Sequence, residues 1–546
     1  MANDGANTAE VQSFSTTVGL LYIFNLIVGT GALALPKAFQ TAGYVLSIVL
    51  LICSAFTSYI CATFVIECLA IANAALKLNP TLERRRLSTS TELSSSDESL
   101  DILPNRRSST FEIIRRLELS ELANIFLGRT GVAFTYLILT IYLFGDLAIY
   151  STTVPKSLMN VICSTVNVTS DYKYALCHPG DLSWHLSRFT VYRICVTTFA
   201  LFCLPMVLVG MTKTKYLQLS TTLSRWTAFI LMISLASIQL FQKGAQASPP
   251  SFELHGFGSF FGVAIYAFMC HHSIPGLITP MREKEFISFR LIYVYLIIFL
   301  FYCALSITGS FAFPVVQDVY TLNFLHDDQT GFFYLILDYF LALFPVFTLT
   351  SSYIIVAITL SNNIRVLIGM IRPKVTNTVT SHVNTENEAL LSNSTSEDEI
   401  IAHDLSNRIL PALRSPTGSM EEPPSPVNNV APERIFSPTL AQRLSGFGKE
   451  LPLPTLVILL PTMLSFYTDN VLLLASITGS YPGVGVQFLI PAILTVGARA
   501  YQAKQLRLSI PEENASPFRH WLWPYAIIGW AAFALVMVSV NIFHLG

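Results

Sequence analysis

Residues 24–39 read FNLIVGTGALALPKAF and lie inside an apolar run long enough to cross a bilayer. Gly29 and Gly31 stand at the centre of this run, and Pro36 follows within two turns. Glycine has no side chain to restrict it to helical geometry, and an interrupted helix persists in lipid only where protein or a wet cavity covers its free backbone groups. The stretch therefore predicts a transmembrane helix that unwinds around residues 28–31.

Composition indicates that most of the chain lies in a membrane. Of its 546 residues, 52% are hydrophobic and 12% are charged, and that charged fraction is about half the fraction in soluble domains. The charged residues separate apolar runs of membrane-spanning length. We predict an all-α polytopic membrane protein of about eleven transmembrane helices, near residues 16–38, 43–75, 120–152, 187–210, 216–242, 256–280, 287–313, 332–361, 451–469, 470–499 and 521–543.

The sixth run carries a second interruption. Residues 263–280 read VAIYAFMCHHSIPGLITP, with polar and helix-breaking residues from Cys270 to Gly276 in mid-segment. A single glycine pair would indicate close packing, but paired breaks in matching helices of two halves are the best sequence indication of a transporter site. Because five is odd, two successive five-helix units run in opposite directions. The pattern predicts a 5+5 inverted repeat with discontinuous helices 1 and 6.

Lys and Arg concentrate in alternate loops, as they do in the cytosolic loops of membrane proteins. The loop after the second run is rich in arginine, whereas the loop after the seventh has no base and carries Asp318. We therefore expect a cytosolic amino terminus. The predicted organisation is a cytosolic tail (1–15), helices 1–2 (16–77), a cytosolic disordered insert (78–118), helices 3–8 (119–365) with an outer loop (155–186), a second cytosolic disordered insert (366–450) and helices 9–11 (451–546).

The outer loop carries two signals of an oxidising, glycosylating compartment. Cys163 and Cys177 both lie in it, and we expect them to form a disulfide. Asn167 begins an Asn-Val-Thr glycosylation acceptor in the same loop.

The second insert contains a candidate sorting motif. Glu386, Leu390 and Leu391 fit the acidic dileucine form that clathrin adaptors bind, although Leu-Leu pairs near acidic residues also arise by chance. The motif favours an endolysosomal membrane and leaves the plasma membrane as the alternative.

At the two breaks the sequence resembles the amino acid/auxin permease family of the amino acid–polyamine–cation transporter superfamily. FNLIVGTGALALPKAFQTAGY (24–44) is similar to that family's first helix, and FMCHHSIP (268–275) to its sixth. Together with ATFVIE (62–67) and YLFGDLAIYSTTVPKSLM (142–159), the first stretch resembles the transmembrane protein 104 family more closely. The resemblance implies a LeuT-like fold and cotransport of amino acids with sodium or protons, without a cofactor.

The resemblance also implies a set of site residues. Backbone contacts to an amino acid head group would come from Val28, Gly29, Thr30 and Gly31, and the opposite side would be lined by Phe268, Met269, Cys270 and His271. Asn25 matches an asparagine that orders the ion site of sodium-coupled members. Sodium-coupled relatives carry a hydroxyl residue before a proline of the eighth helix, whereas this chain has Phe344, with Thr348 and Ser351 further on. Sodium coupling is therefore in doubt.

Ionisable residues inside membrane helices are costly and indicate function. His271, Asp146 and Asp338 are the candidates for carrying a coupling proton, which requires a group that titrates between conformations. The alternatives are a hydrogen-bonded structural role for the histidine and a pairing of Asp146 with Lys156. Glu67 is expected to reach the cytosolic interface.

The remaining features exclude other classes of protein. We find no catalytic or nucleotide-binding motif and no nucleic-acid signature, and the adjacent His271 and His272 do not form a metal site on a regular helix. Trp226, like other aromatic residues near helix ends, is interpreted as an interfacial anchor. The rival to a transporter is a sensor of the same fold that binds an amino acid and signals through its cytosolic inserts.

Overall fold

The computed structural model describes residues 14–79, 110–163, 175–178, 186–209, 215–325, 332–371 and 452–545. Asn167 and the sorting motif of Glu386, Leu390 and Leu391 lie outside these residues.

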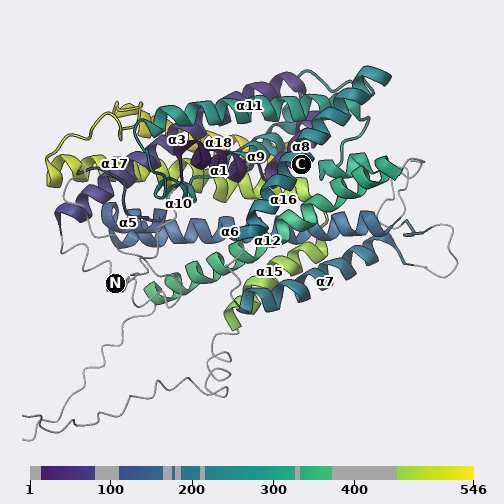
Figure 1. Ribbon diagram of the computed structural model, residues 1–546, viewed down its shortest axis with the longest axis horizontal. Helices are drawn as coiled ribbons and strands as arrows, with labels where there is room; N and C mark the ends of the chain where they lie inside the picture. The colour runs from purple at the N-terminus through teal and green to yellow at the C-terminus, as the bar shows by residue number, and fades with distance from the viewer. Residues whose placement is uncertain are drawn as a thin grey trace, which may run out of the picture. The chain divides into compact units, whose positions relative to one another are not determined.

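The described residues are almost entirely helical (Figure 1). Their helices are α1 (Thr16–Ile27), α2 (Thr30–Ala42), α3 (Tyr44–Leu78), α5 (Leu119–Phe126), α6 (Gly128–Ile162), α7 (Arg188–Val209), α8 (Lys215–Lys243), α9 (Phe257–Ala267), α10 (Ile274–Ile278), α11 (Ile287–Ala312), α12 (Phe332–Ile371), α15 (Pro452–Tyr467), α16 (Val471–Thr478), α17 (Ile490–Tyr501) and α18 (Leu522–Leu545). Short 3-10 turns, η1 (Leu254–Gly256) and η2 (Tyr320–Phe324), precede α9 and α12, and π-helical turns η3 (Gly479–Gly483) and η4 (Gly485–Leu489) join α16 to α17. In these ranges β-pairing is limited to two isolated bridges.

The chain is a polytopic helical membrane protein. In the described residues, eight helices are long and apolar enough to cross a bilayer, and the bent pair α1–α2 raises this number to nine. Two shorter apolar helices lie at Leu254–Ala267 and Pro452–Tyr467. Both predicted interruptions are present: α1 and α2 meet at a bend of 51°, and six residues separate the end of α9 from the start of α10.

Several predicted boundaries are wrong. The third run divides into α5 and α6, where Gly128 adopts a φ of 69° that favours glycine. Helix α6 then continues to Ile162, so the first part of the predicted outer loop (155–186) is helical. Helix α12 likewise extends to Ile371, past the predicted end of the eighth run and into the predicted second insert.

The end of the first predicted insert is packed rather than disordered. Phe111, Ile113 and Leu117 are buried in the core. The side-chain oxygen of Asn73 in α3 accepts from the amides of Ile114 and Arg115, at 3.2 and 2.8 Å.

Lys284, in the loop between α10 and α11, also holds this segment. Its amino group donates to the Ile113 carbonyl oxygen. Burial lowers the pKa of Lys284 to about 8, an effect that the nearby Glu112 carboxylate opposes. The end of the predicted insert therefore shields the Lys284 amino group from water, and it is part of the folded bundle.

Glu67, which was expected to reach the cytosolic interface, is only 3% exposed and pairs with Arg499 of α17 at 2.7 Å. The carboxylate also accepts from the Ser516 amide at 3.0 Å, and the Arg499 guanidinium donates to the Phe518 carbonyl oxygen at 2.9 Å. The pair thus joins α3, α17 and the loop before α18.

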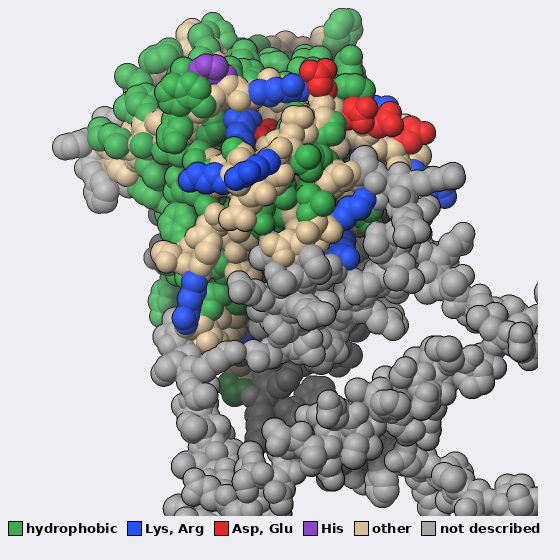
Figure 2. All heavy atoms as spheres, turned by 90° about the vertical axis from the view of Figure 1, so that its left-hand side faces the viewer, with side chains coloured by type: hydrophobic (Ala, Val, Ile, Leu, Met, Phe, Trp, Pro, Cys, Tyr) green, Lys and Arg blue, Asp and Glu red, His purple; other side chains and the backbone are tan. Residues whose placement is uncertain are grey.

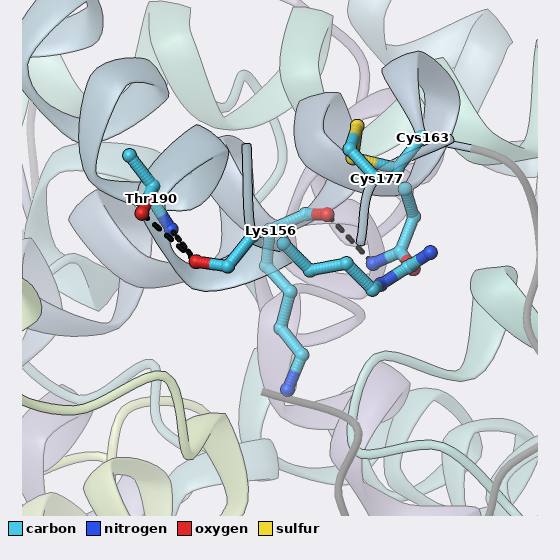
Figure 3. The surroundings of a disulfide bond; sticks show 7 residues. Lys156, Cys163, Cys177 and Thr190 are labelled. Atoms are coloured by element: carbon cyan, nitrogen blue, oxygen red, sulfur yellow. Dashed lines mark hydrogen bonds between the residues drawn. A yellow bond between two sulfur atoms is a disulfide. The ribbon is translucent and has the colours of Figure 1, made fainter. Parts of the chain in front are cut away.

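A second group of contacts lies at the carboxyl end of α6. Cys163 and Cys177 form a disulfide that ties the end of α6 to the segment before α7 (Figure 3). Lys156 points away from the disulfide in that view and pairs with Asp318 at 2.8 Å. The proposed pairing of Lys156 with Asp146 is therefore wrong.

Basic side chains are exposed at the end of the bundle where α5 and the carboxyl end of α17 lie. Figure 2 looks at this end, on the left of Figure 1, and shows Lys and Arg side chains among hydrophobic ones. Lys504, Arg507 and Arg519, between α17 and α18, are exposed.

We predict that Arg499→Met lowers the free energy of unfolding by about 3 to 5 kcal/mol, because removing one partner of a buried ion pair leaves the other charge unpaired. The melting temperature of the purified protein in detergent checks this. Glu512→Gln is the matched control, since it breaks an exposed pair with Arg519 and is expected to leave the melting temperature unchanged. Equal losses in both variants would contradict the prediction.

Candidate functional site

The first break frees backbone groups at the end of α1. In a continuous helix the amide of Gly29 would donate to the Asn25 carbonyl oxygen, four residues earlier. Here that amide donates to the Ile27 carbonyl oxygen at 2.8 Å, and α2 begins at Thr30. The first amides of a helix have no intrahelical partner and form the positive end of its dipole. The break therefore presents free carbonyl groups on one side and free amides on the other.

The second break is held by α3 and α11. The Ser58 carbonyl oxygen accepts from Nε2 of His271 at 3.0 Å, and the Ser58 hydroxyl donates to the Phe268 carbonyl oxygen at 3.4 Å. Because a carbonyl only accepts, Nε2 carries the hydrogen, and Nδ1 of His271 has no hydrogen-bond partner in the described chain. The Phe268 ring stacks on Tyr295 of α11, and the Cys270 sulfur lies 3.4 Å from the Tyr295 hydroxyl.

The two breaks meet at one tyrosine of α11. The Tyr302 hydroxyl lies 3.0 Å from the Ile27 carbonyl oxygen, at the end of α1, and 2.9 Å from that of Ala267, at the end of α9. A hydroxyl has one hydrogen, so the two carbonyl groups share it.

Helices α2 and α9 also touch directly, backbone against backbone. A Cβ on Gly31 would lie 2.5 Å from the Cα of Ala267, closer than any real side chain allows. On its other faces α9 packs against α3, α16 and α18 (Figure 1). Gly31 thus permits close approach of the two half-helices. By contrast, a Cβ on Gly29 would meet nothing nearer than 3.9 Å.

A buried carboxylate is linked to the start of α2. The Thr30 hydroxyl lies 2.8 Å from the Tyr266 hydroxyl, which donates to Asp146 of α6. The Tyr150 hydroxyl is also bonded to Asp146. Asp146 is 7% exposed, and no Lys or Arg of the described chain forms an ion pair with it. Thr30 of α2 and Tyr266 of α9, far apart in the sequence, are therefore linked to one carboxylate on α6.

A small pocket lies on the other side of the first break, between α1, α8 and α11. Its lining residues are Phe24, Asn25, Val28, Arg225, Trp226, Phe229 and Phe301. The Arg225 guanidinium donates to the Asn25 carbonyl oxygen at 2.6 Å, and the Asn25 side chain donates to the Thr222 hydroxyl at 3.0 Å. Trp226 stacks on Phe24, with 4.3 Å between the ring centroids. Trp226, interpreted from the sequence as an interfacial anchor, therefore also lines this pocket.

Other predicted residues lie outside these contacts. The hydroxyls of Thr348 and Ser351 donate to carbonyl oxygens of their own helix, those of Phe344 and Thr348, at 2.9 and 3.0 Å. Asp338 is buried within α12, and Met269 is buried in the second break. In the described residues no three His, Cys, Asp or Glu side chains gather as metal ligands would.

The sequence analysis missed three residues that hold the site together: Tyr266, Tyr302 and Arg225. Arg225 was detectable, because it is an ionisable residue within the fifth apolar run. The two tyrosines gave no such signal, since tyrosine is common near helix ends.

Taken together, these residues offer the polar groups that a small zwitterion would need. Free amides at the start of α2 suit a carboxylate, carbonyl groups of the unwound residues suit an amine, and Asp146 can accept a proton through hydroxyl contacts.

Comparison with known proteins agrees with this chemistry. The family model described as transmembrane amino acid transporter protein matches residues 12–79 and 87–513. A transmembrane protein 104 homolog of Caenorhabditis briggsae is 49% identical over 545 residues, covering 99% of each chain. Human transmembrane protein 104 is 34% identical over 566 residues, again covering 99% of each chain. The predicted resemblance is confirmed, and the chain belongs to the family of transmembrane amino acid transporter proteins, within its transmembrane protein 104 group.

Proposed function

We propose that this chain is a secondary active transporter of amino acids or similar small zwitterions. The substrate binds between the α1–α2 and α9–α10 breaks, and alternating access exposes it to the two sides of the membrane in turn. The observation that carries the proposal is the meeting of the two breaks at the Tyr302 hydroxyl. Paired discontinuous helices that meet at mid-membrane are the usual site of substrate binding in such transporters.

The substrate's carboxylate binds at the amino end of α2. The surroundings of Gly29 support this placement, because a Cβ there would meet only backbone oxygens at 3.9 Å and no side chain, so that a ligand atom can approach the backbone. The substrate's amine binds to carbonyl groups of the unwound residues, among them Val28. Phe268, Met269, Cys270 and His271 bound the site from the second break.

The coupling ion is a proton, and Asp146 is the group that carries it. Its position supports this role: the carboxylate is buried, without a cation partner in the described chain, and is one tyrosine away from Thr30 at the start of α2. A lone carboxylate in a membrane interior is costly when charged, so binding of a proton is favoured while the carboxylate is buried. His271 and Asp338 remain secondary candidates.

The architecture in this proposal has eleven membrane crossings. Eight long helices, the bent pair α1–α2 and the two shorter apolar helices together account for this number. Helices 1–5 and 6–10 form the inverted repeat, and the amino terminus is cytosolic. The membrane is endolysosomal or the plasma membrane, with clathrin adaptors as partners of the dileucine motif.

Uptake of labelled amino acids into liposomes that contain the purified full-length protein tests the proposal. The internal pH is set above or equal to the external pH, with sodium or choline as the cation. Gradient-driven uptake establishes transport. Amino acid binding without uptake under any gradient would reject transport and favour a sensor.

The two glycines of the first break are predicted to respond differently to alanine. Gly29→Ala adds a methyl group that fits without a clash but occupies the place proposed for the ligand, so uptake falls while the melting temperature stays unchanged. Gly31→Ala forces α2 and α9 apart, which lowers the free energy of unfolding by about 1 to 3 kcal/mol, so the melting temperature falls as well. Full uptake by Gly29→Ala would contradict the placement of the substrate.

Asp146→Asn is predicted to abolish the acceleration of uptake by an inward proton gradient while exchange of internal for external amino acid continues. Tyr266→Phe, which removes one donor to the carboxylate, is expected to weaken the same acceleration. Tyr192→Phe is the control, because its buried hydroxyl bonds to the Ser465 carbonyl oxygen, away from the site. Undiminished proton stimulation in Asp146→Asn would reject the assignment.

A further inference from the structure

The carbonyl end of α1 is where a bound cation would be expected. Freed carbonyl groups and the negative end of a half-helix dipole attract positive charge, and transporters with broken helices use such ends to coordinate sodium or protons. In this chain the Asn25 carbonyl group is one of those freed, because the Gly29 amide has turned to Ile27.

A side chain already supplies positive charge at this place. Arg225 of α8 donates to the freed Asn25 carbonyl oxygen at 2.6 Å and lines the pocket beside the break. In the part of the chain that the structure describes, no Asp or Glu forms an ion pair with Arg225. The positive charge of the guanidinium is therefore stabilised by the negative end of the α1 dipole rather than by a carboxylate.

The neighbouring residues offer a sodium ion few ligands. The Phe344 ring of α12 packs edge-on against Phe229, which lines the same pocket, with 5.8 Å between the centroids. Phe24, Trp226 and Phe301 supply further aromatic surface. Sodium is a hard cation that prefers oxygen ligands, and a guanidinium at the shared carbonyl oxygen would repel it.

We propose that the Arg225 guanidinium occupies the place of a coupling cation at the carbonyl end of α1, so that the protein works without sodium. This inference rests on the proposed transport function. Its consequence is that removal of the guanidinium leaves a vacancy which sodium fills.

The test uses the full-length protein and two variants, Arg225→Ala and Arg225→Gln. Melting temperatures are measured in detergent with sodium chloride or choline chloride at equal ionic strength. Uptake of a tritiated mixture of the standard amino acids is measured in the same two salts. Arg193→Ala is the matched control, because this arginine of α7 also donates to a carbonyl oxygen near a helix end, that of Phe466 at 3.3 Å.

In the unmodified protein and in Arg193→Ala, the choice of salt is expected to change neither the melting temperature nor uptake. In the Arg225 variants sodium is expected to raise both. At a sodium concentration about ten times the Kd, the folded-to-unfolded ratio rises about eleven-fold. Variants that fold only in sodium would give the same support.

The proposal is overturned if sodium stabilises the unmodified protein or is required for its uptake. It is also overturned if the Arg225 variants fold and show no sodium effect, or fold in neither salt. Absence of uptake by the unmodified protein under every gradient would reject transport instead. The melting temperatures would still decide whether Arg225 occupies a cation site.

Discussion

The hydrogen of the Tyr302 hydroxyl holds the centre of this protein together. It is shared by the carbonyl groups of Ile27 and Ala267, which end α1 and α9. The Ile27 carbonyl oxygen also accepts from the Gly29 amide within the break. An unsatisfied backbone group in lipid is costly, so a helix that unwinds there needs a partner from another helix. Because a single hydroxyl serves both helix ends, neither half-helix can move far without disturbing the other.

Some residues around this hydroxyl fix the helices in place, and others are available for binding in the proposed function. Gly31 and Ala267 touch backbone to backbone, which fixes the distance between α2 and α9. A Cβ at Gly29, two residues earlier, would meet nothing nearer than 3.9 Å. Asp146 is linked to the start of α2 and Arg225 is bonded to the end of α1, and neither has a charged side-chain partner in the described residues. In this account Asp146 takes up a coupling proton, and Arg225 removes the need for a metal cation.

The sequence predicted what depends on local backbone chemistry. Glycines 29 and 31 and the segment from Cys270 to Gly276 marked both breaks, because their conformational signal lies in adjacent residues. Burial and partners were less predictable. The alternative that Asp146 pairs with Lys156 considered a partner on the same helix, yet its donor Tyr266 is 120 residues away in sequence. Nothing in the residues around Glu67 indicates its partner Arg499, 432 residues later.

The most direct test of a substrate site at the paired breaks is the accessibility of a cysteine at Gly29. Gly29→Cys is treated with a charged, membrane-impermeant thiol reagent from either side of a sealed liposome, with and without amino acids. The unmodified chain, with its own cysteines, is the control. The account predicts modification from both sides, slowed by amino acids. Modification that amino acids leave unchanged, or that occurs from one side alone under all conditions, would contradict a substrate site with alternating access.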